Sequence, residues 1–221
     1  MKKLLVSALL SATVLGAGLA VSSSADAADL AQGAKTDATV SFKAGDGTKP
    51  IDPVDPTKPP VDPDNPGTGN TGNLAIVYAS QKIDFGTNFE IPTKEMTYET
   101  KKTVSLEVGD VRGTNAGWAL SVKAPEFKSG TDVLTGAQIV IDASDDVSVH
   151  EAPVGTVTAV SKGVTVGADA SVMLSAAKGT GSGITIDNLA AGKIKLVVPA
   201  GIAKAQAYST TMNWTLSDVP A

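Results

Sequence analysis

The sequence predicts an all-β fold, a β-sandwich-like or barrel-like domain of many short strands with a proline-rich extended loop near the N-terminus. Short apolar runs recur from Leu74 onward and are separated by Gly, Asp, Asn and Pro. Threonine and branched aliphatic residues, which favour pleated and half-buried surfaces, are abundant, and aromatic residues make up only 4% of the chain. Strand and helix patterns do not alternate along the sequence, which argues against a parallel α/β sheet.

Two runs alternate apolar and polar residues with period two and are the clearest strands, residues 104–108 and 118–122. Many short strands with turn signals between them are typical of a sandwich or a barrel. Residues 202–207 favour a short helical turn because alanine favours helix. The other strand candidates are residues 137–141, 147–149, 156–160, 164–166, 171–174, 184–186, 193–198 and 212–216.

The first 27 residues have the pattern of a secretory signal peptide. Lys2 and Lys3 are followed by an apolar run from Leu4 to Leu19 and by the small-x-small site Ala25-Asp26-Ala27. The apolar run is short for a bilayer span, which disfavours the alternative of a retained anchor. We therefore expect secretion, removal of residues 1–27, and no membrane insertion afterwards.

Charge and cysteine content limit how the mature chain can be held at a surface. Signal removal leaves 16 basic and 22 acidic residues, a net charge of −6. Such a chain is repelled by nucleic acid and by anionic membranes or wall polymers, so no nucleic-acid partner is expected. Cysteine is absent, which excludes a lipoprotein anchor, and the C-terminus has no sortase signal. Retention is therefore expected to be non-covalent, through sugar stacking, hydrogen bonds or a protein partner.

The mature chain divides into three parts by composition. Residues 28–48 are small and polar, with a strand-like run at residues 39–42. Residues 49–73 form a Pro/Asp/Gly-rich loop or spacer, in which seven of the twelve prolines lie between positions 49 and 66. Proline and acidic repulsion favour an exposed, polyproline-like segment here, and docking of a partner on the prolines is the alternative. Residues 74–221 form the main part of the domain.

Two Trp-Xaa-Leu triplets use both tryptophans of the chain, Trp118-Ala119-Leu120 and Trp214-Thr215-Leu216. Residues i and i+2 of a strand share a face, so each Trp lies on the same side as the Leu of its triplet. Three interpretations are open. Both indoles are core residues, or both lie at a sheet edge or groove where they stack on sugar rings, or one face is packed and one edge is exposed.

The run from Asp110 to Gly117 connects two strands and is interpreted as a supported loop. Gly113 and Gly117 permit positive φ or close backbone approach. Arg112 can form a bidentate salt bridge with a carboxylate and brace the loop, or it can recognise a ligand carboxylate. The bracing role is the more economical of the two.

The sequence offers little support for catalysis, and we predict no enzyme, no catalytic residue, no metal and no cofactor. His150 is the only histidine and is interpreted as a strand-end surface residue, and no Gly-x-Ser-x-Gly run exists. Residues 179–183, a Gly-Thr-Gly-Ser-Gly run, are interpreted as a flexible turn. An acidic cluster is interpreted as a solvated turn without a calcium site, although two carboxylates can in principle serve a glycosidase. This cluster consists of Asp142, Asp145, Asp146 and Glu151.

The chain from about Asp37 to its C-terminus resembles the WxL-domain family of Gram-positive surface proteins. The resemblance is carried by the two triplets, the proline-rich stretch, Asp84-Phe85-Gly86, the run from Asp110 to Leu120, and Leu134-Thr135-Gly136-Ala137. It implies secretion, a cell-surface location, and non-covalent attachment to peptidoglycan through the domain. It also implies other surface proteins of the same system as partners.

The resulting hypothesis is a wall-attached binding module in which Trp118, Leu120, Trp214 and Leu216 bind the ligand. The first alternative is a structural or interaction subunit whose ligand is a partner surface protein, bound along an exposed strand edge. The second alternative is a wall-active glycosidase.

Overall fold

The structure is a computed structural model that describes residues 35–54, 62, 64–153, 156 and 158–220. The expected signal peptide lies outside these residues. The chain separates into two units, residues 1–41 and residues 42–221. The described part of the first unit, residues 35–41, is extended and exposed and contains no strand. The strand expected at residues 39–42 is therefore not formed.

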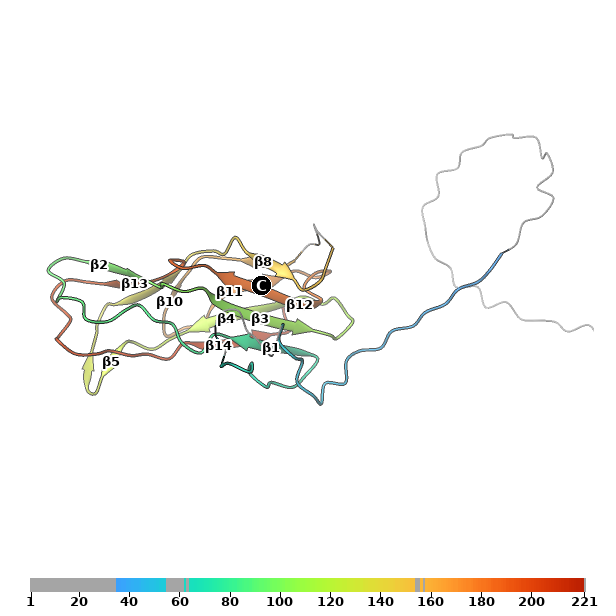
Figure 1. The fold of residues 1–221 in the computed structure, drawn as a ribbon, viewed down its shortest axis with the longest axis horizontal. Coiled ribbons are helices and arrows are strands. Elements are labelled where there is room, and N and C mark those ends of the chain that lie inside the picture. Colours follow the sequence, from blue (N-terminus) through green and yellow to red (C-terminus); the bar gives the residue numbers. More distant parts are fainter. Residues whose placement is uncertain (1–34, 55–61, 63, 154–155, 157, 221) are drawn as a thin grey trace, which may run out of the picture. The chain divides into compact units, whose positions relative to one another are not determined.

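The second unit is built entirely from antiparallel strands, and no helix occurs in the part of the chain that the structure describes (Figure 1). The all-β prediction is confirmed. The fourteen strands are β1 (Leu74–Ala79), β2 (Met96–Glu99), β3 (Val104–Asp110), β4 (Trp118–Lys123), β5 (Lys128–Ser129), β6 (Asp132–Val133), β7 (Gln138–Ile141), β8 (Val147–Val149), β9 (Val160–Ser161), β10 (Val164–Val166), β11 (Ser171–Ala176), β12 (Gly183–Leu189), β13 (Ile194–Val198) and β14 (Asn213–Ser217).

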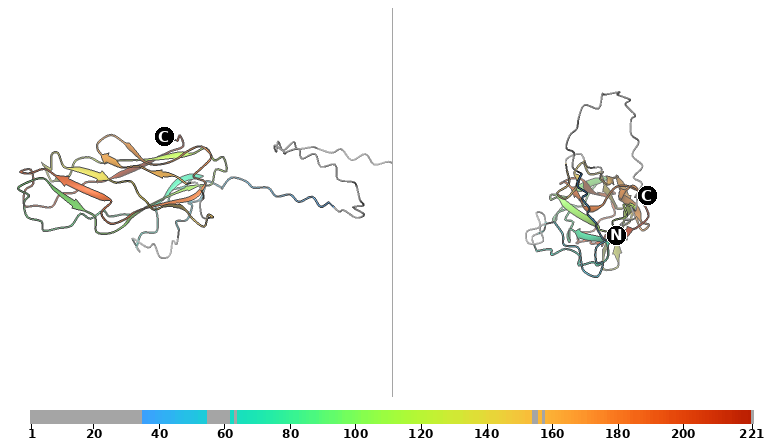
Figure 2. Two further views of the ribbon diagram at one scale, coloured as in Figure 1. Left: turned by 90° about the horizontal axis from the view of Figure 1, so that it is seen from above. Right: turned by 90° about the vertical axis from the view of Figure 1, so that its right-hand side faces the viewer.

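These strands form three four-stranded sheets and one small hairpin. Sheet I has the order β1-β3-β12-β8, sheet II β10-β7-β13-β2, and sheet III β14-β4-β11-β9, while β5 and β6 pair with each other. Consecutive strands join the two sheets, β2 to β3, β7 to β8 and β12 to β13. Their order across sheet I, β3-β12-β8, is the same as the order of their partners across sheet II, β2-β13-β7. The connecting residues are themselves paired, since Asp142 N donates to Lys193 O and Gly192 N donates to Thr100 O. Sheet II therefore continues sheet I as one layer, which faces sheet III (Figure 2).

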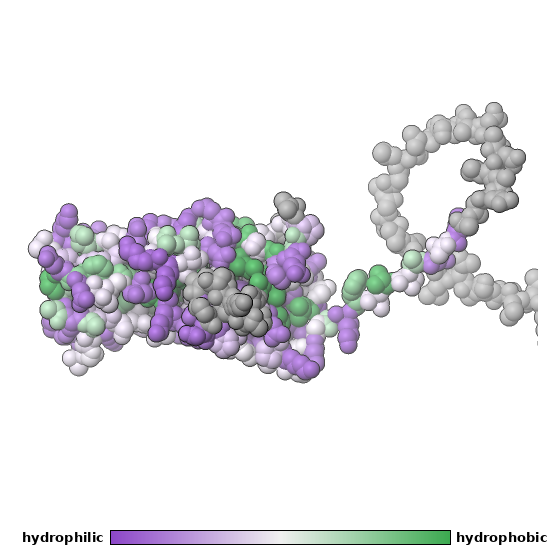
Figure 3. Space-filling view, in the orientation of Figure 1, coloured by the Kyte–Doolittle hydropathy of each residue, from purple (hydrophilic) through white to green (hydrophobic). Residues whose placement is uncertain are grey.

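One continuous apolar core lies between the layers. The alternating strands supply it as predicted, because Leu106 and Val108 of β3 and Leu120 and Val122 of β4 are each fully buried. Sheet II adds Ile141 and other aliphatic side chains to the same cluster. The face of the domain seen in Figure 3 is mostly hydrophilic, with smaller apolar areas between the polar side chains.

The outer face of β3 is also buried, which the alternating pattern does not predict. Glu107 is 5% exposed, and its Oε2 accepts a hydrogen bond from Val54 N at 2.9 Å. A Cβ on Gly109 would lie 2.8 Å from both Ile51 and Val77. The described ends of the proline-rich segment thus pack on sheet I, and Pro53 and Asn65 are buried. These two positions differ from the expected exposed spacer, whose residues 55–61 and 63 lie outside the described part.

Most expected strands are found near their predicted bounds. The strand expected at residues 156–160 is reduced to β9, and residues 158–159 are not in a strand. The helical turn expected at residues 202–207 is wrong, because these residues form bends and irregular structure. β1, β2 and the β5–β6 hairpin were not predicted individually, since β2 is mostly exposed and the hairpin strands have two residues each.

Candidate functional site

The two Trp-Xaa-Leu triplets lie side by side on neighbouring strands of sheet III. β4 and β14 are antiparallel, with Leu216 opposite Leu120 and Trp214 opposite Val122. Directly opposed residues share a face, so both tryptophans and both leucines lie on the core side of the sheet. The structure thus brings together the four residues predicted to bind the ligand, although the triplets are almost one hundred positions apart in the chain.

Trp118 is enclosed by the core. Its relative exposure is 0%, and its Nε1 donates a hydrogen bond of 3.0 Å to Gly181 O. A Cβ on Gly181 would lie 2.6 Å from that Nε1, so the indole needs a glycine at this position. Trp118 is therefore a packing residue whose polar atom is satisfied inside the domain.

Gly181 is an important residue that the sequence reasoning missed. Residues 179–183 were interpreted as a flexible turn, yet Gly181 is buried and holds the indole of Trp118. Its φ of 77° is in the region that favours glycine. The run of alternating glycines indicates a turn, but nothing in it indicates which distant residue the turn contacts.

Trp214 has a different environment, because it lines an open groove together with residues of β14 and β1. The groove has a volume of about 1050 Å³, and its lining includes Asn73, Arg112 and Asp218 beside the second triplet. Trp214 and Leu216 are half-buried, whereas Leu120 is fully buried. The three interpretations left open by the sequence do not separate the two indoles, whereas the structure encloses Trp118 and leaves Trp214 partly open to solvent.

The connection between β3 and β4 is braced at the end of this groove. Arg112 Nε donates to Asp110 Oδ1 at 2.9 Å and Nη2 donates to Asp110 Oδ2 at 2.8 Å, which makes a bidentate pair. The same Nη2 also donates to Gly117 O at 2.8 Å. Asp110 is 1% exposed, and its hydrogen bond raises the pKa of Arg112. The guanidinium is thus already engaged on two sides within its own loop.

The two glycines of this loop differ in what surrounds them. Gly117 has a φ of 83°, and a Cβ there would lie 2.5 Å from Ala176 O of the neighbouring strand. Gly113 has a φ of 70° with open space around it. Close backbone approach therefore requires glycine at position 117, whereas only the backbone conformation favours it at position 113.

The two strands that border the groove differ in how their edges are covered. Three carbonyls of β1 are occupied, because Thr68 N donates to Val77 O at 2.9 Å, Asn65 Nδ2 to Ala79 O at 2.8 Å and Asn70 Nδ2 to Ile76 O at 3.1 Å. In the described chain, no backbone group of β14 has such a bond outside its ladder with β4. β14 also has no proline, charge or bulge, the usual means of protecting an edge strand.

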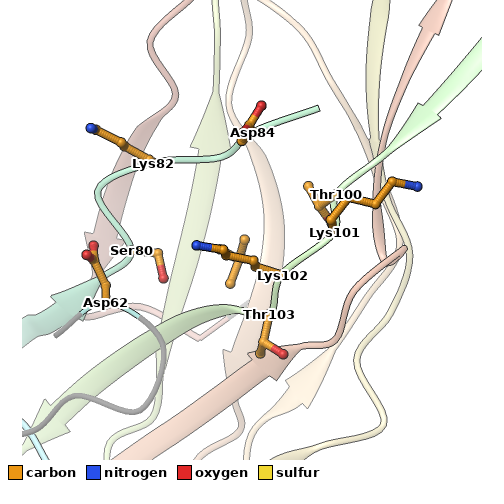
Figure 4. A pocket seen from close by; sticks show the side chains of 9 residues that line it. Asp62, Ser80, Lys82, Asp84, Thr100, Lys101, Lys102 and Thr103 are labelled. Carbon is orange, nitrogen blue, oxygen red and sulfur yellow. The ribbon is translucent and has the colours of Figure 1, made fainter. Parts of the chain in front are cut away.

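A second, smaller pocket of about 220 Å³ lies beside the turn between β2 and β3 (Figure 4). Its lining includes Lys82, Lys102 and the carboxylates of Asp62 and Asp84. Asp62 Oδ2 accepts from Gln81 N at 3.1 Å, and Asp84 Oδ1 accepts from Gly86 N at 2.8 Å. Asp84 thus caps a local backbone turn, whereas Asp62 holds the backbone of a distant segment at Gln81. These hydrogen bonds account for the positions of both carboxylates.

The acidic cluster forms ordinary surface ion pairs and hydrogen bonds. Lys195 Nζ lies 2.6 Å from Asp142 Oδ2, Lys193 Nζ lies 2.8 Å from Asp145 Oδ2, and Asn188 Nδ2 donates to Asp146. Within the described ranges, no group of three or more His, Cys, Asp or Glu side chains is arranged to hold a metal ion. His150 follows β8 directly and is exposed, as the sequence predicts.

One carboxyl group, that of Asp187, is completely buried in the core. Asp187 of β12 is 0% exposed, and neither of its oxygens makes a hydrogen bond with another described residue. It lies opposite Leu106 in the β12–β3 ladder and so shares the core face. Burial raises the pKa of Asp187 to about 6, while the nearby Ser144 and Ser161 hydroxyls oppose that rise.

The fold and site define a class of protein, an all-β domain organised around two paired Trp-Xaa-Leu strands. Comparison with protein families identifies it further. The family model described as WxL domain surface cell wall-binding matches residues 29–220, and the chain belongs to this family. Comparisons with curated proteins and with solved structures found no match.

Family membership confirms the resemblance drawn from the two triplets. The chain carries a cell wall-binding domain of a family located at the cell surface, and this family is not a family of enzymes. Among the described residues, no helix is long and apolar enough to cross a membrane.

Proposed function

We propose that this chain is secreted by a Gram-positive bacterium and attaches non-covalently to peptidoglycan, with the groove at Trp214 and Leu216 as its binding site. The single observation that supports this proposal most is the unequal environment of the two indoles. Trp118 is enclosed and its Nε1 is bonded within the domain, whereas Trp214 is half-buried in an open groove. The second indole is the one with surface left to contact a ligand.

The chemistry of the groove suits a neutral or amidated sugar polymer. An indole presents an apolar face on which a sugar ring can stack, and it has an N–H that can donate at the edge. Asn73 and Thr215 line the same groove and supply amide and hydroxyl groups for sugar hydroxyls and acetamido groups. Arg112 and Asp218 have opposite charges and so add little net field to the groove.

In this proposal Trp118 and Leu120 support the site from the core, while Trp214 and Leu216 contact the ligand. Asp110, Arg112, Gly113 and Gly117 hold the loop at the end of the groove. The bidentate bond between Arg112 and Asp110, with the further bond to Gly117 O, supports this assignment. The Arg112 guanidinium already makes its hydrogen bonds to Asp110 and Gly117 O within the loop, which favours a bracing role over recognition of a ligand carboxylate.

The test is co-sedimentation of residues 28–221 with purified peptidoglycan stripped of proteins and anionic polymers. Trp214→Ala is expected to lower the bound fraction at least tenfold while the protein stays folded in a thermal melt. Phe89→Ala is the matched control, because Phe89 is a 53% exposed aromatic residue outside the groove. Equal binding by Trp214→Ala and the wild type would remove the groove as the peptidoglycan site.

A second candidate function is that of an interaction subunit that binds a partner surface protein. It is favoured by the uncovered edge of β14, which can accept an extended strand. Wild-type protein that fails to sediment with bare peptidoglycan but sediments with walls that retain their proteins would favour this candidate over the first.

A further inference from the structure

The edge of β14 and one extended segment of the chain have complementary features. β14 has five residues, no charge, no proline and no bulge, and it forms a ladder on one side only within the described chain. Residues 39–44 belong to an extended segment (Figure 1), form no ladder, and have an apolar residue at every second position, Val40 and Phe42. These two side chains are 79% and 91% exposed, so the segment leaves its apolar face uncovered.

The periods of the two strands match. Trp214 and Leu216 are two residues apart on the core side of β14, and Val40 and Phe42 are two residues apart in the segment. An antiparallel strand added to β14 can place Phe42 opposite Trp214 and Val40 opposite Leu216. This arrangement makes one aromatic pair and one aliphatic pair, which are stabilising cross-strand contacts. Thr39, Ser41 and Lys43 then face away from the core side, where polar residues are tolerated.

The groove next to β14 provides the space that an added strand needs. It has a volume of about 1050 Å³ and is bordered by β1, whose own edge carbonyls are bonded to Asn65 and Thr68. An incoming strand therefore pairs with β14 alone and lies beside a covered edge of sheet I. Its apolar side chains would cover the open side of Trp214 and Leu216.

We propose that β14 accepts residues 39–44 of a second copy of this chain as an added antiparallel strand, so that copies associate by strand exchange. Reciprocal exchange gives a closed dimer, and one-way exchange gives a chain of copies. The occupant is a copy of the same protein because this sequence itself contains an unpaired segment of the right length, period and exposure. This inference is based on the strand edge and does not rest on wall binding. An added strand covers the groove in which the ligand is proposed to bind, so association of copies and ligand binding compete for it.

The first experiment is sedimentation velocity of residues 28–221 over a wide concentration range. Association that is weakened at least tenfold by the double change Val40→Asp and Phe42→Asp supports the proposal. Both side chains are exposed, so these changes leave folding intact. Val160→Asp is the matched control, because Val160 is 60% exposed on β9 at the opposite edge of sheet III. A wild type that stays monomeric, or association that the double change leaves intact, overturns the proposal.

The second experiment tests the register between β14 and the added strand. The chain has no native cysteine, so any disulfide forms only between the introduced residues. The proposed ladder places Ser41 of one copy opposite Thr215 of the other, a distance that a disulfide can span. Mixed Ser41→Cys and Thr215→Cys variants should form a mixed disulfide under mild oxidation. Ser41→Cys mixed with Val160→Cys should not. A variant with both cysteines that forms only an internal bridge would assign β14 to the segment of its own chain and overturn exchange between copies.

Discussion

Leu120 and Leu216 lie directly opposite each other in the β4–β14 ladder, so the last residues of the two Trp-Xaa-Leu triplets meet across neighbouring strands. Leu120 is fully buried, and Leu216 is half-buried beside the groove. The ladder thus links a triplet that belongs to the core to a triplet at the edge of the sheet.

The two tryptophans should differ in their contribution to stability. Trp118→Ala removes a fully buried indole and its bond to Gly181 O, so the free energy of unfolding should fall by about 3–5 kcal/mol. Trp214→Ala removes a half-buried side chain and should cost clearly less. Urea unfolding followed by circular dichroism measures both values. Equal losses would contradict the different environments of the two residues.

Gly181 should be intolerant of any side chain. Gly181→Ala places a Cβ against Ala176 and Trp118 at a φ of 77°, and we expect a loss of at least about 1 kcal/mol. Gly167→Ala is the control, because nothing lies within 4 Å of a Cβ there and its φ is not positive. Thermal melting should show a lower midpoint for the first variant and little change for the second.

The Asp110–Arg112 pair should matter more than an exposed ion pair of similar length. Arg112→Lys cannot keep two parallel bonds to Asp110 together with the bond to Gly117 O, so we expect a loss of about 1–3 kcal/mol. Lys204→Gln breaks an exposed pair with Asp132 and should change the unfolding midpoint little. If both variants unfold alike, the loop at residues 110–117 does not depend on this brace.

Asp187 should make the domain less stable as pH rises. Its pKa of about 6 in the folded state is above the value of 3.8 expected in the unfolded state, so the folded state binds more protons between these values. The free energy of unfolding should therefore fall between about pH 4 and pH 6, by up to about 3 kcal/mol from this group. Asp187→Asn should raise stability at pH 7 and have little effect below pH 4.

The control for this prediction is Asp169→Asn, because Asp169 is an exposed carboxylate in the loop before β11. It should leave the pH dependence of the unfolding midpoint unchanged. A wild type and an Asp187→Asn variant with identical stability curves from pH 3 to pH 8 would mean that Asp187 is paired or solvated in the folded protein.

The sequence was sufficient to predict the all-β class of the fold and to single out the two Trp-Xaa-Leu triplets. Period-two alternation correctly placed Leu120 and Val122 on the same side as Trp118, because side-chain direction in a strand is a local property. Pairing between β4 and β14 is not local, since it depends on how sheets assemble from strands far apart in the chain. The alternation therefore could not predict which tryptophan lies in the core and which at the edge.

The alternating pattern also could not predict that residues on the outward face of β3 are buried. Glu107 and Gly109 occupy polar or small positions of β3, which the alternation assigns to the outside. They are covered because Ile51 and Val54 of the proline-rich segment pack there. Proline content correctly indicates extended backbone, but an extended segment can lie on a sheet as readily as it can project into solvent.

The most direct test of the central claim uses the two indole N–H signals in a ¹H–¹⁵N correlation spectrum of residues 28–221. Titration with soluble, uncharged peptidoglycan fragments should shift the signal of Trp214 and leave that of Trp118 in place, because the latter is bonded to Gly181 O inside the core. The signals are assigned with Trp118→Phe and Trp214→Phe variants. A titration that saturates without moving the Trp214 signal would contradict ligand binding in the β14 groove.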